Sequence, residues 1–283
     1  MKIGVSFYTF DQKVDYAEAI DQSAKAGYDG VEFILSETGQ LNMKTSDKDI
    51  LVLRKAANDA GMEVCSVGAW NLWEFNLVND DPKISNYARD IIKKQIDIAQ
   101  ACGADTILCI PGWVGTPFAP GIVPYDVAYE RAQKILSELA SYAEAAKVYI
   151  GVENVGNGFL LSPLEMRSFI DEIGSDYMGA YFDLGNILYS AGYPDQWIRI
   201  LGHRIKKIHF DDFRCDVGGM GGFVDLFAGD VDYEAVMRAM KDIGYDDWAT
   251  VEFLPNYRRF PYQSIINARY SMDRILEIWA SLD

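Results

Sequence analysis

The chain is predicted to fold as one α/β domain, a (β/α)8 barrel of the TIM-barrel type spanning residues 1–283. Eight short apolar runs rich in β-branched residues alternate with helical stretches, and no linker interrupts the alternation. The length of 283 residues slightly exceeds the roughly 250 typical of this architecture. A doubly wound open sheet is the alternative, and it is disfavoured because no Gly-x-Gly-x-x-Gly turn follows the first apolar run.

The eight apolar runs are typical of strands that are buried on both faces of a parallel sheet. They lie near residues 3–8, 30–34, 63–69, 106–111, 148–153, 178–183, 205–210 and 248–254. Glycines precede most of these runs, as expected where a helix finishes in the left-handed conformation. The pattern repeats most clearly in GYDGVEF at residues 27–33 and GYDDWATVEF at residues 244–253.

Two helices show clear start signals. At residues 162–165 a serine is followed by a proline and then a glutamate, which predicts an N-cap with a capping box. After Asp232, an apolar stripe at helical spacing includes Tyr233, Val236 and Met240. This spacing predicts an amphipathic helix that covers a sheet.

The charge balance bears on the partners of the protein. The chain has 42 acidic and 26 basic residues, giving a net charge of −16. Because this charge repels phosphate backbones and anionic lipids, we expect neither nucleic acid nor a membrane as partner. No run approaches the roughly 18–20 apolar residues of a membrane span, and no signal-peptide pattern begins the chain. Four widely spaced cysteines without a Cys-x-x-Cys pair favour reduced thiols, so we expect a cytoplasmic protein.

An anionic substrate would need a local group of basic side chains in this acidic molecule. The candidates for such a group are Lys206, Lys207, Arg214, Arg258 and Arg259. Composition alone leaves open whether these side chains converge. It also leaves open whether the protein is a monomer or a homo-oligomer.

Four of the apolar runs end in an ionisable residue. These residues are Glu153, Asp183, His209 and Glu252, on the fifth to eighth predicted strands, and His209 is one of only two histidines in the chain. In a barrel, the C-terminal strand ends carry the active site, and adjacent strands lie about 4.8 Å apart. The four side chains are therefore predicted to meet and to bind one metal ion.

Each of these residues alone also has an ordinary structural interpretation. Glu153 can be a solvated strand end, Asp183 a turn initiator, and His209 a hydrogen-bonded core residue. The tripeptide Val-Glu-Phe around Glu252 occurs again at Glu32, so by itself it carries little weight. The coincidence on four consecutive strands favours a shared metal site. Three carboxylates with one imidazole suit Mn²⁺ best, with Co²⁺, Mg²⁺ and Zn²⁺ as alternatives.

Six segments carry a resemblance to a known family. They are GYDGVEF, GVENVGNG, YFDLGN, KIHFDDF, GGFVDLFAGDVDYEAV and GYDDWATVEF. Over essentially its whole length the chain resembles the xylose isomerase-like superfamily of sugar phosphate isomerases and epimerases. The superfamily includes ketose and pentulose-phosphate 3-epimerases, hydroxypyruvate isomerase, inosose dehydratase and an apurinic-site endonuclease branch. The resemblance implies that Glu153, Asp183, His209 and Glu252 hold one metal, and that the two glutamates act as acid and base.

Some positions depart from the pattern of this family. Many members have lysine in place of Asp211, and free-ketohexose epimerases have glutamate in place of Phe159 and a histidine near Asn186. The arginine that binds sugar hydroxyls in those enzymes is matched only by Arg214, one residue out of register. These departures weaken a free-ketohexose assignment and leave the general chemistry unchanged.

The functional hypothesis is proton transfer at a carbon next to a ketone of a sugar or sugar phosphate. A metal would stabilise the enediolate, and one glutamate would remove the proton that the other returns. Return to the opposite face gives epimerisation, and return to the neighbouring carbon gives isomerisation. The predicted substrate contacts are Tyr8, Glu32, Trp113, Asn186 and Arg214.

Further residues are predicted around this site with alternatives left open. Asp212 is expected to hydrogen-bond a metal ligand. Glu32 is expected to contact the substrate or to orient a metal ligand, with a salt-bridged structural role as an equal alternative. Trp70 and Trp73 are expected to wall the cavity, and Trp73 suits ordinary packing equally well. The glycine-rich segment 216–230 is interpreted either as a lid or phosphate loop or as a plain connection.

Three rival functions follow from the same residues. A dehydratase would use the same metal and base, followed by loss of a β-hydroxyl. A non-catalytic sugar-binding barrel is a second alternative, disfavoured by the intact glutamate pair. Phosphodiester hydrolysis in damaged DNA needs a histidine-rich, multi-metal centre, which two histidines in an acidic chain cannot build.

Overall fold

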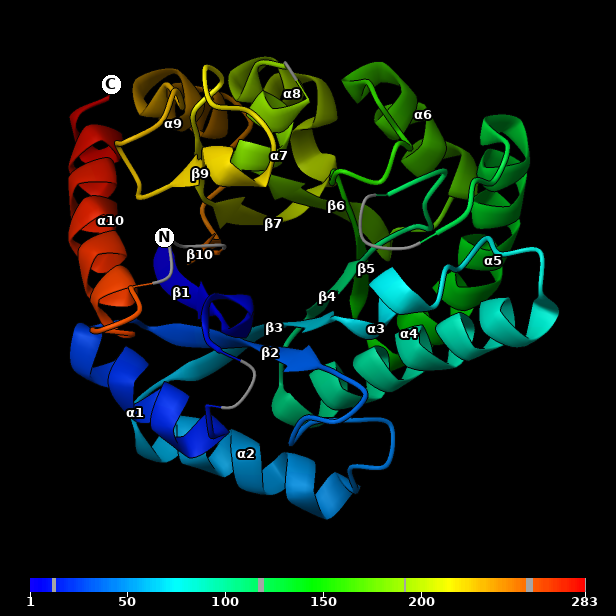
Figure 1. The fold of residues 1–283 in the computed structure, drawn as a ribbon, viewed down its shortest axis with the longest axis horizontal. Coiled ribbons are helices and arrows are strands. Elements are labelled where there is room, and N and C mark those ends of the chain that lie inside the picture. Colours follow the sequence, from blue (N-terminus) through cyan, green and yellow to red (C-terminus); the bar gives the residue numbers. More distant parts are fainter. Residues whose placement is uncertain (12–13, 117–119, 191, 253–256, 283) are drawn as a thin grey trace.

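The computed structural model describes residues 1–282 except 12–13, 117–119, 191 and 253–256. Eight parallel strands form a closed barrel in the order β1-β10-β7-β6-β5-β4-β3-β2 (Figure 1). The strands are β1 (Lys2–Ser6), β2 (Gly30–Leu35), β3 (Glu63–Ala69), β4 (Thr106–Cys109), β5 (Tyr149–Glu153), β6 (Met178–Asp183), β7 (Ile205–Phe210) and β10 (Trp248–Val251). The predicted (β/α)8 barrel is therefore confirmed.

The predicted strand positions differ from the observed ones mainly at the strand ends. The first strand stops at Ser6, and Phe7–Thr9 form a 3-10 turn, η1. The fourth strand stops at Cys109, two residues earlier than predicted. Positions 253–254 of the last predicted strand lie outside the described residues.

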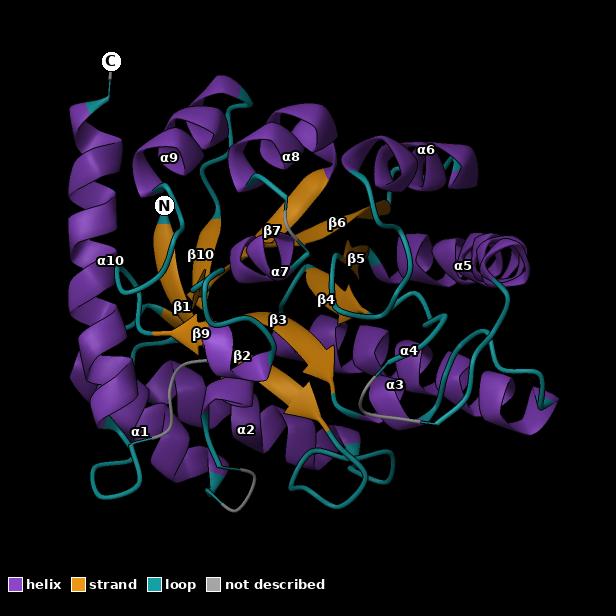
Figure 2. Cartoon of the chain, turned by 45° about the horizontal axis from the view of Figure 1, so that its top comes forward, coloured by secondary structure: helices purple, strands orange, loops and turns teal. Residues whose placement is uncertain are grey.

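Helices surround the barrel on its outer side, and two short helices directly follow strands at its C-terminal end (Figures 1 and 2). They are α1 (Tyr16–Ala26), α2 (Asp47–Asp59), α3 (Asn71–Glu74), α4 (Pro82–Cys102), α5 (Tyr125–Ala146), α6 (Pro163–Ile173), α7 (Leu184–Tyr189), α8 (Pro194–Leu201), α9 (Tyr233–Asp242) and α10 (Gln263–Ser281). The C-terminal helix α10 packs against both α1 and α9, so it closes the ring of helices. None of the helices in the described ranges is both long and apolar enough for a membrane crossing.

Both predicted helix starts are confirmed. The Ser162 side chain accepts a hydrogen bond from the Glu165 backbone N–H at the start of α6. The Asp232 side chain accepts one from the Ala235 N–H at the start of α9. Since these bonds satisfy amides that have no partner within the helix, they fix where each helix begins. The apolar stripe predicted on α9 faces the core, as the burial of Val236 shows.

The interior of the barrel is unusually polar. Ser6, Glu32, Ser66 and Tyr181 are fully buried in it, where barrels commonly place branched aliphatic side chains. Buried polar groups need hydrogen-bond partners, and these four bond to one another around the Glu32 carboxylate. The polar interior thus forms a support directly beneath the C-terminal end of the barrel.

Lys207 lies at the opposite, N-terminal end of the barrel. Its ammonium group is 2.9 Å from Asp105 Oδ1 and 2.5 Å from Asp247 Oδ2, and its side chain is buried. Burial would lower the pKa of Lys207, but the charges of Asp105 and Asp247 raise it above its usual value. Lys207 therefore stays charged at the base of the barrel, away from any substrate at the C-terminal end.

A short hairpin that was not predicted follows β7. Strands β8 (Asp212–Phe213) and β9 (Phe223–Val224) pair antiparallel, and the 3-10 turn η3 (Met220–Gly222) precedes β9. Two-residue strands give too short a pattern to recognise in a sequence. The hairpin gives the glycine-rich segment a defined course over the end of the barrel.

Candidate metal centre

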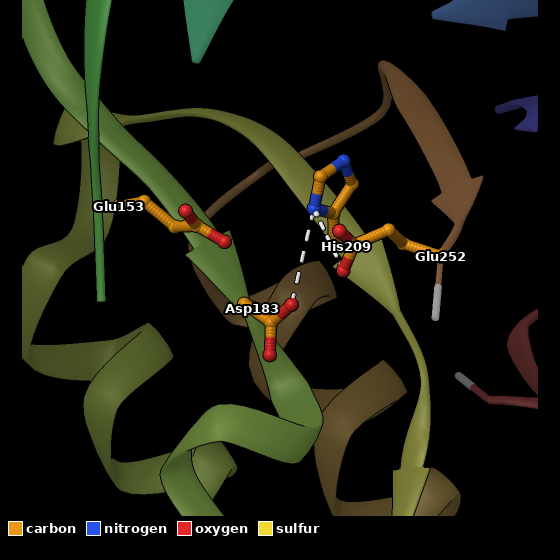
Figure 3. Close-up of side chains that lie close together, drawn as sticks. All are labelled: Glu153, Asp183, His209 and Glu252. Carbon is orange, nitrogen blue, oxygen red and sulfur yellow. Dashed lines mark ion pairs between the residues drawn. The ribbon is translucent and has the colours of Figure 1, made fainter. Parts of the chain in front are cut away.

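The four predicted metal ligands lie together at the C-terminal end of the barrel. Glu153, Asp183, His209 and Glu252 each offer one ligand atom, and these atoms all lie within 4.8 Å of one another. Figure 3 shows Glu153 and Glu252 reaching the cluster from opposite sides. Asp183 and His209 are fully buried, whereas Glu153 and Glu252 are 5% and 8% exposed.

Strand register explains why these side chains converge. Glu153 and Asp183 are the last residues of β5 and β6, and Glu252 directly follows β10. Asp183 and His209 are register partners on β6 and β7, so their side chains project from the same face of the sheet. The arrangement is therefore set by backbone pairing.

A β-bulge produces the match between Asp183 and His209. Ala180 pairs with Ile205, but Tyr181 pairs with Lys207, so β7 has one extra residue at Lys206. In continuous register Asp183 would be level with the residue before His209, whose side chain points to the other face. Because of the bulge, the side chains of Asp183 and His209 project from the same face of the sheet.

Two buried atoms of the cluster lack hydrogen-bond partners. They are His209 Nδ1 and Asp183 Oδ2, which lie 3.8 Å apart, and neither has a partner among the described residues. His209 Nδ1 is also 3.6 Å from Glu252 Oε2. Unpartnered buried polar atoms are rare in native proteins, and a shared cation would satisfy both. The residues present therefore fit a divalent metal ion.

The second nitrogen of His209 is held by Glu32. His209 Nε2 is 3.1 Å from Glu32 Oε1, and this carboxylate also accepts hydrogen bonds from Ser6 (2.5 Å), Ser66 (2.7 Å) and Tyr181 (2.6 Å). A carboxylate at Nε2 places the histidine proton on that nitrogen. Nδ1 then carries no proton, and its lone pair can coordinate a metal. Glu32 is fully buried behind His209, so its position fits the expected roles of orienting a ligand or forming a buried ion pair better than a substrate contact.

The carboxyl groups of the cluster are difficult to ionise together. Burial and the charge of Asp183 raise the pKa of Glu153 well above its usual value, and burial and Glu252 do the same for Asp183. Burial also raises the pKa of Glu252, against the opposing effect of His209. A divalent cation would offset this repulsion, since it favours the ionised form of each ligand.

A cavity of about 450 Å³ opens above the cluster. It is lined by Tyr8, Trp70, Trp73, Glu153, Val155, Gly156, Asn186, Tyr189, Met220, Phe223 and Glu252. Tyr8 and Asn186 were predicted to contact substrate, and the structure places both in this wall. Of the four clustered residues, Glu153 and Glu252 face the cavity, and Asp183 and His209 lie behind them.

Three other predicted site residues lie elsewhere. Arg214 is 47% exposed and pairs with Asp216 at 2.6 Å on the surface, so its charge is directed away from the cavity. Trp113 is 3% exposed and is absent from the cavity wall. Asp212 accepts backbone N–H bonds from Phe213, Phe227, Gly229 and Val231, so it holds the loop after β7 instead of a metal ligand.

Asp211 was not predicted as a site residue, but it lies next to Asp183. It is 1% exposed, accepts the Gly185 N–H at 2.6 Å, and has its pKa raised by burial and by Asp183. The sequence contains a signal for this position, because side chains two residues apart on a strand, such as those of residues 209 and 211, lie on the same face.

Several curated proteins are similar along most of the chain. A putative L-ribulose-5-phosphate 3-epimerase from Escherichia coli is 22% identical, over 95% of this chain and 94% of that protein. A D-psicose 3-epimerase from Enterocloster bolteae is 25% identical, over 89% and 82%. An inosose dehydratase from Clostridium botulinum is 22% identical, over 84% and 81%.

Solved structures share the fold over the full length. A D-psicose 3-epimerase crystallised with D-fructose has a TM-score of 0.81 and 16% identity, covering 99% of this chain and all of that one. A structure described as the IOLI protein with a bound zinc atom has a TM-score of 0.79 and 19% identity, covering all of both chains. The sequence model of one family matches residues 20–271. The chain therefore belongs to the xylose isomerase-like TIM barrel family.

Proposed function

We propose that the protein is a divalent-metal-dependent isomerase or epimerase of a sugar or sugar phosphate. One observation carries the proposal: Glu153 and Glu252 face the cavity from opposite sides, while Asp183 and His209 hold the same centre from behind. Two opposed carboxylates are what proton removal and proton return at one carbon require. The epimerase names of two relatives support an enzyme of the isomerase class.

The metal ion of this proposal is held by Glu153, Asp183, His209 and Glu252. A bound divalent cation would polarise a ketone and stabilise the negative charge that develops on its oxygen. Mn²⁺ is the first choice because the donors are three carboxylates and one imidazole. Zinc in a structural neighbour keeps Zn²⁺ among the alternatives.

The two glutamates move the proton in this proposal. In one direction Glu153 removes a proton from the carbon next to the ketone, and protonated Glu252 supplies one from the other side. In the other direction the two residues exchange these roles, so each acts once as base and once as acid. A positioned base contributes about 10²–10⁴ in rate, whereas enzymes reach at least about 10⁶, so the metal must supply much of the rest.

Aromatic side chains exclude water from this reaction. Tyr8 and Trp70 pack edge to face with ring centroids 4.6 Å apart, and Trp73 lines the same cavity. Such walls prevent solvent from competing for the proton during transfer. Asn186 adds an uncharged amide that can bind a hydroxyl group.

The decisive experiment combines metal analysis with isotope exchange. The purified protein should contain one divalent ion per chain, and, loaded with Mn²⁺, it should catalyse solvent deuterium incorporation into a member of a panel of ketoses, ketose phosphates and inososes. Glu153→Gln and Glu252→Gln should each reduce exchange at least about 10²-fold. Full exchange by both variants with every active compound would refute the acid and base roles.

A dehydratase is the second candidate, favoured by the similarity to inosose dehydratases. It would use the same proton abstraction and then expel a β-hydroxyl as water. Incubation with an inosose distinguishes the two functions, because dehydration gives an unsaturated product that absorbs in the ultraviolet and epimerisation does not.

A further inference from the structure

The wall of the cavity above Glu153 and Glu252 is almost entirely apolar. Asn186 and the two glutamates are its polar side chains, apart from the hydroxyls of two tyrosines and the indole N–H groups of two tryptophans. Among the described residues, no lysine or arginine lines the cavity.

From this wall we infer that the substrate is a keto sugar or keto cyclitol that carries an apolar, preferably aromatic, substituent and no phosphate. The inference rests on the proposed function, because it assigns a substrate class to the same site. Glu153 and Glu252 would contact the reacting carbons of the sugar, and the apolar side chains of the wall would contact the substituent.

The electrostatics of the cavity oppose a phosphate. A phosphate monoester carries about −1.5 to −2 charges, and here it would lie beside clustered carboxylates in a protein of net charge −16. The three carboxylates of the cluster already match the charge of the proposed divalent ion, so a phosphate would enter a cavity whose described wall offers it no further counter-charge, which is costly. A ligand without charge avoids this cost.

The five basic residues that were candidates for binding a phosphate lie outside the cavity wall that the structure describes. Lys207 is held by Asp105 and Asp247 at the far end of the barrel, and Arg214 pairs with Asp216. The remaining candidates, Lys206, Arg258 and Arg259, are absent from the cavity wall.

Several backbone amides of the glycine-rich segment are already hydrogen-bonded within the segment. The backbone N–H groups of Val217 and Gly218 donate to Arg214, and that of Gly222 donates to Gly219, so these amides are already used. The segment instead places the Met220 and Phe223 side chains in the cavity wall. This favours contact with an apolar group over contact with an anion.

The apolar wall is built before any ligand binds. On one side the Tyr189 and Phe223 rings stack with centroids 6.4 Å apart and 20° between planes, and on the other Tyr8 and Trp70 pack edge to face. Tyr189 is 36% and Met220 43% exposed at the cavity mouth. Exposed apolar side chains gathered around a cavity gain free energy when an apolar ligand covers them.

The size of the cavity agrees with a substituted sugar. Its volume of about 450 Å³ falls within the roughly 300–1,000 Å³ of pockets that enclose drug-sized ligands. A bare sugar would place some of its hydroxyl groups against Val155, Met220 and Phe223, which cannot hydrogen-bond them well, and each such burial is unfavourable. An aromatic substituent fills that part of the wall without this loss.

The test uses matched derivatives of one ketose. D-fructose, its 1-O-methyl, 1-O-benzyl, 6-O-methyl and 6-O-benzyl ethers, and its 1- and 6-phosphates are compared by kcat/KM for deuterium exchange with the Mn²⁺-loaded protein. At one position or the other, we expect the benzyl ether to exceed both the methyl ether and the phosphate at least tenfold. A phosphate that equals or exceeds the benzyl ethers, or benzyl and methyl ethers of equal rate at both positions, would overturn the inference.

Two lysine variants of the loop sharpen the test. Met220→Lys adds a cation to the cavity wall and should shift the ratio of benzyl ether to phosphate at least tenfold toward phosphate. Val217→Lys is the matched control, because Val217 is exposed on the same segment and does not line the cavity. It should leave the ratio unchanged, and an equal shift in both variants would contradict the assigned wall.

Equilibrium binding separates this inference from the proposed function. If no compound exchanges deuterium, the proposed function fails for this panel, and the affinities of the same compounds for the Mn²⁺-loaded protein decide the substrate class. Tighter binding of a benzyl ether than of its matched phosphate and methyl ether supports the inference. Equal or weaker binding of both benzyl ethers refutes it.

Discussion

Glu32 is the residue that gives His209 a defined role. Burial would raise the pKa of Glu32, but the charge and hydrogen bond of His209, with hydrogen bonds from Ser6 and Tyr181, lower it below its usual value. The carboxylate is therefore ionised, and an ionised acceptor holds the proton of His209 on Nε2. This orientation leaves Nδ1 directed toward Asp183 and Glu252.

Glu32→Gln is predicted to weaken Mn²⁺ binding by about 10–100-fold, because the histidine loses the charge that fixes its tautomer and raises its basicity. The affinity is measured by competition with a chelator, and circular dichroism verifies the fold. Glu63→Gln at the exposed start of β3 is the control and should bind Mn²⁺ like the wild type. Wild-type affinity in Glu32→Gln would mean that His209 is oriented without this carboxylate.

At the level of elements, two bulges align the polar interior with the ligand cluster. One brings Asp183 level with His209 across β6 and β7. The other lies between Val31 and Glu32 on β2 and brings Glu32 level with Ser66 on β3, which donates a hydrogen bond to it. Since a one-residue shift exchanges the two faces of a strand, each bulge decides which side chains meet.

Gly179 is predicted to be essential for the bulge between β6 and β7. A Cβ at this position would lie 2.6 Å from the Arg204 carbonyl oxygen and 2.5 Å from Lys206 Cγ, so an alanine must push β7 away. Gly179→Ala should cost about 1–3 kcal/mol in the free energy of unfolding and should also weaken Mn²⁺ binding, because Asp183 and His209 shift apart. Urea unfolding and metal titration measure the two effects.

Gly174→Ala is the control for this variant. Gly174 has a φ of +69°, and a Cβ there would contact nothing within 4 Å, so only the left-handed backbone is strained, by about 1–2 kcal/mol. It should lose a similar stability while keeping its Mn²⁺ affinity. Equal metal affinities in the two variants would show that the bulge does not position the ligands.

The same elements show what a sequence can predict. Apolar runs and helix caps are local patterns, so all eight strands and the starts of α6 and α9 were recognisable. The four clustered residues could be found because each lies at or next to the end of one of those strands. The bulges depend on pairing between strands, which no single strand encodes. Arg214 and Asp212 were assigned to the site because their neighbours belong to it, but the β8–β9 hairpin turns one outward and uses the other to hold a loop.

At the scale of the whole molecule, the cluster concentrates negative charge in a protein that is already strongly acidic. Glu153, Asp183 and Glu252 all have raised pKa values, with burial as the largest cause. The folded protein without metal therefore binds protons that the unfolded chain releases above its ordinary carboxyl pKa values of about 4. Folding, proton binding and metal binding are thus linked at one site.

This linkage predicts that the metal-free protein loses stability as the pH rises from 5 to 8. A group whose pKa is higher in the folded state stabilises the fold below its unfolded pKa, and that contribution disappears as the pH rises through the folded value. Each proton retained only by the folded state gives a slope of about −1.4 kcal/mol per pH unit. His209, whose pKa is also raised, acts in the same direction, and Glu32, whose pKa is lowered, changes only at lower pH.

Urea unfolding in EDTA and in Mn²⁺ at pH 5, 6, 7 and 8 measures this linkage. In EDTA the free energy of unfolding should fall with pH, and the gain on adding Mn²⁺ should grow with pH, because the ion replaces protons on its ligands. The Asp183→Asn, Glu153→Gln double variant should show a flatter profile and little gain, which distinguishes the cluster from the general repulsion of an acidic surface. A metal gain that stays constant across this range, or a profile identical in the variant, would show that these carboxyl groups ionise as freely in the fold as in water.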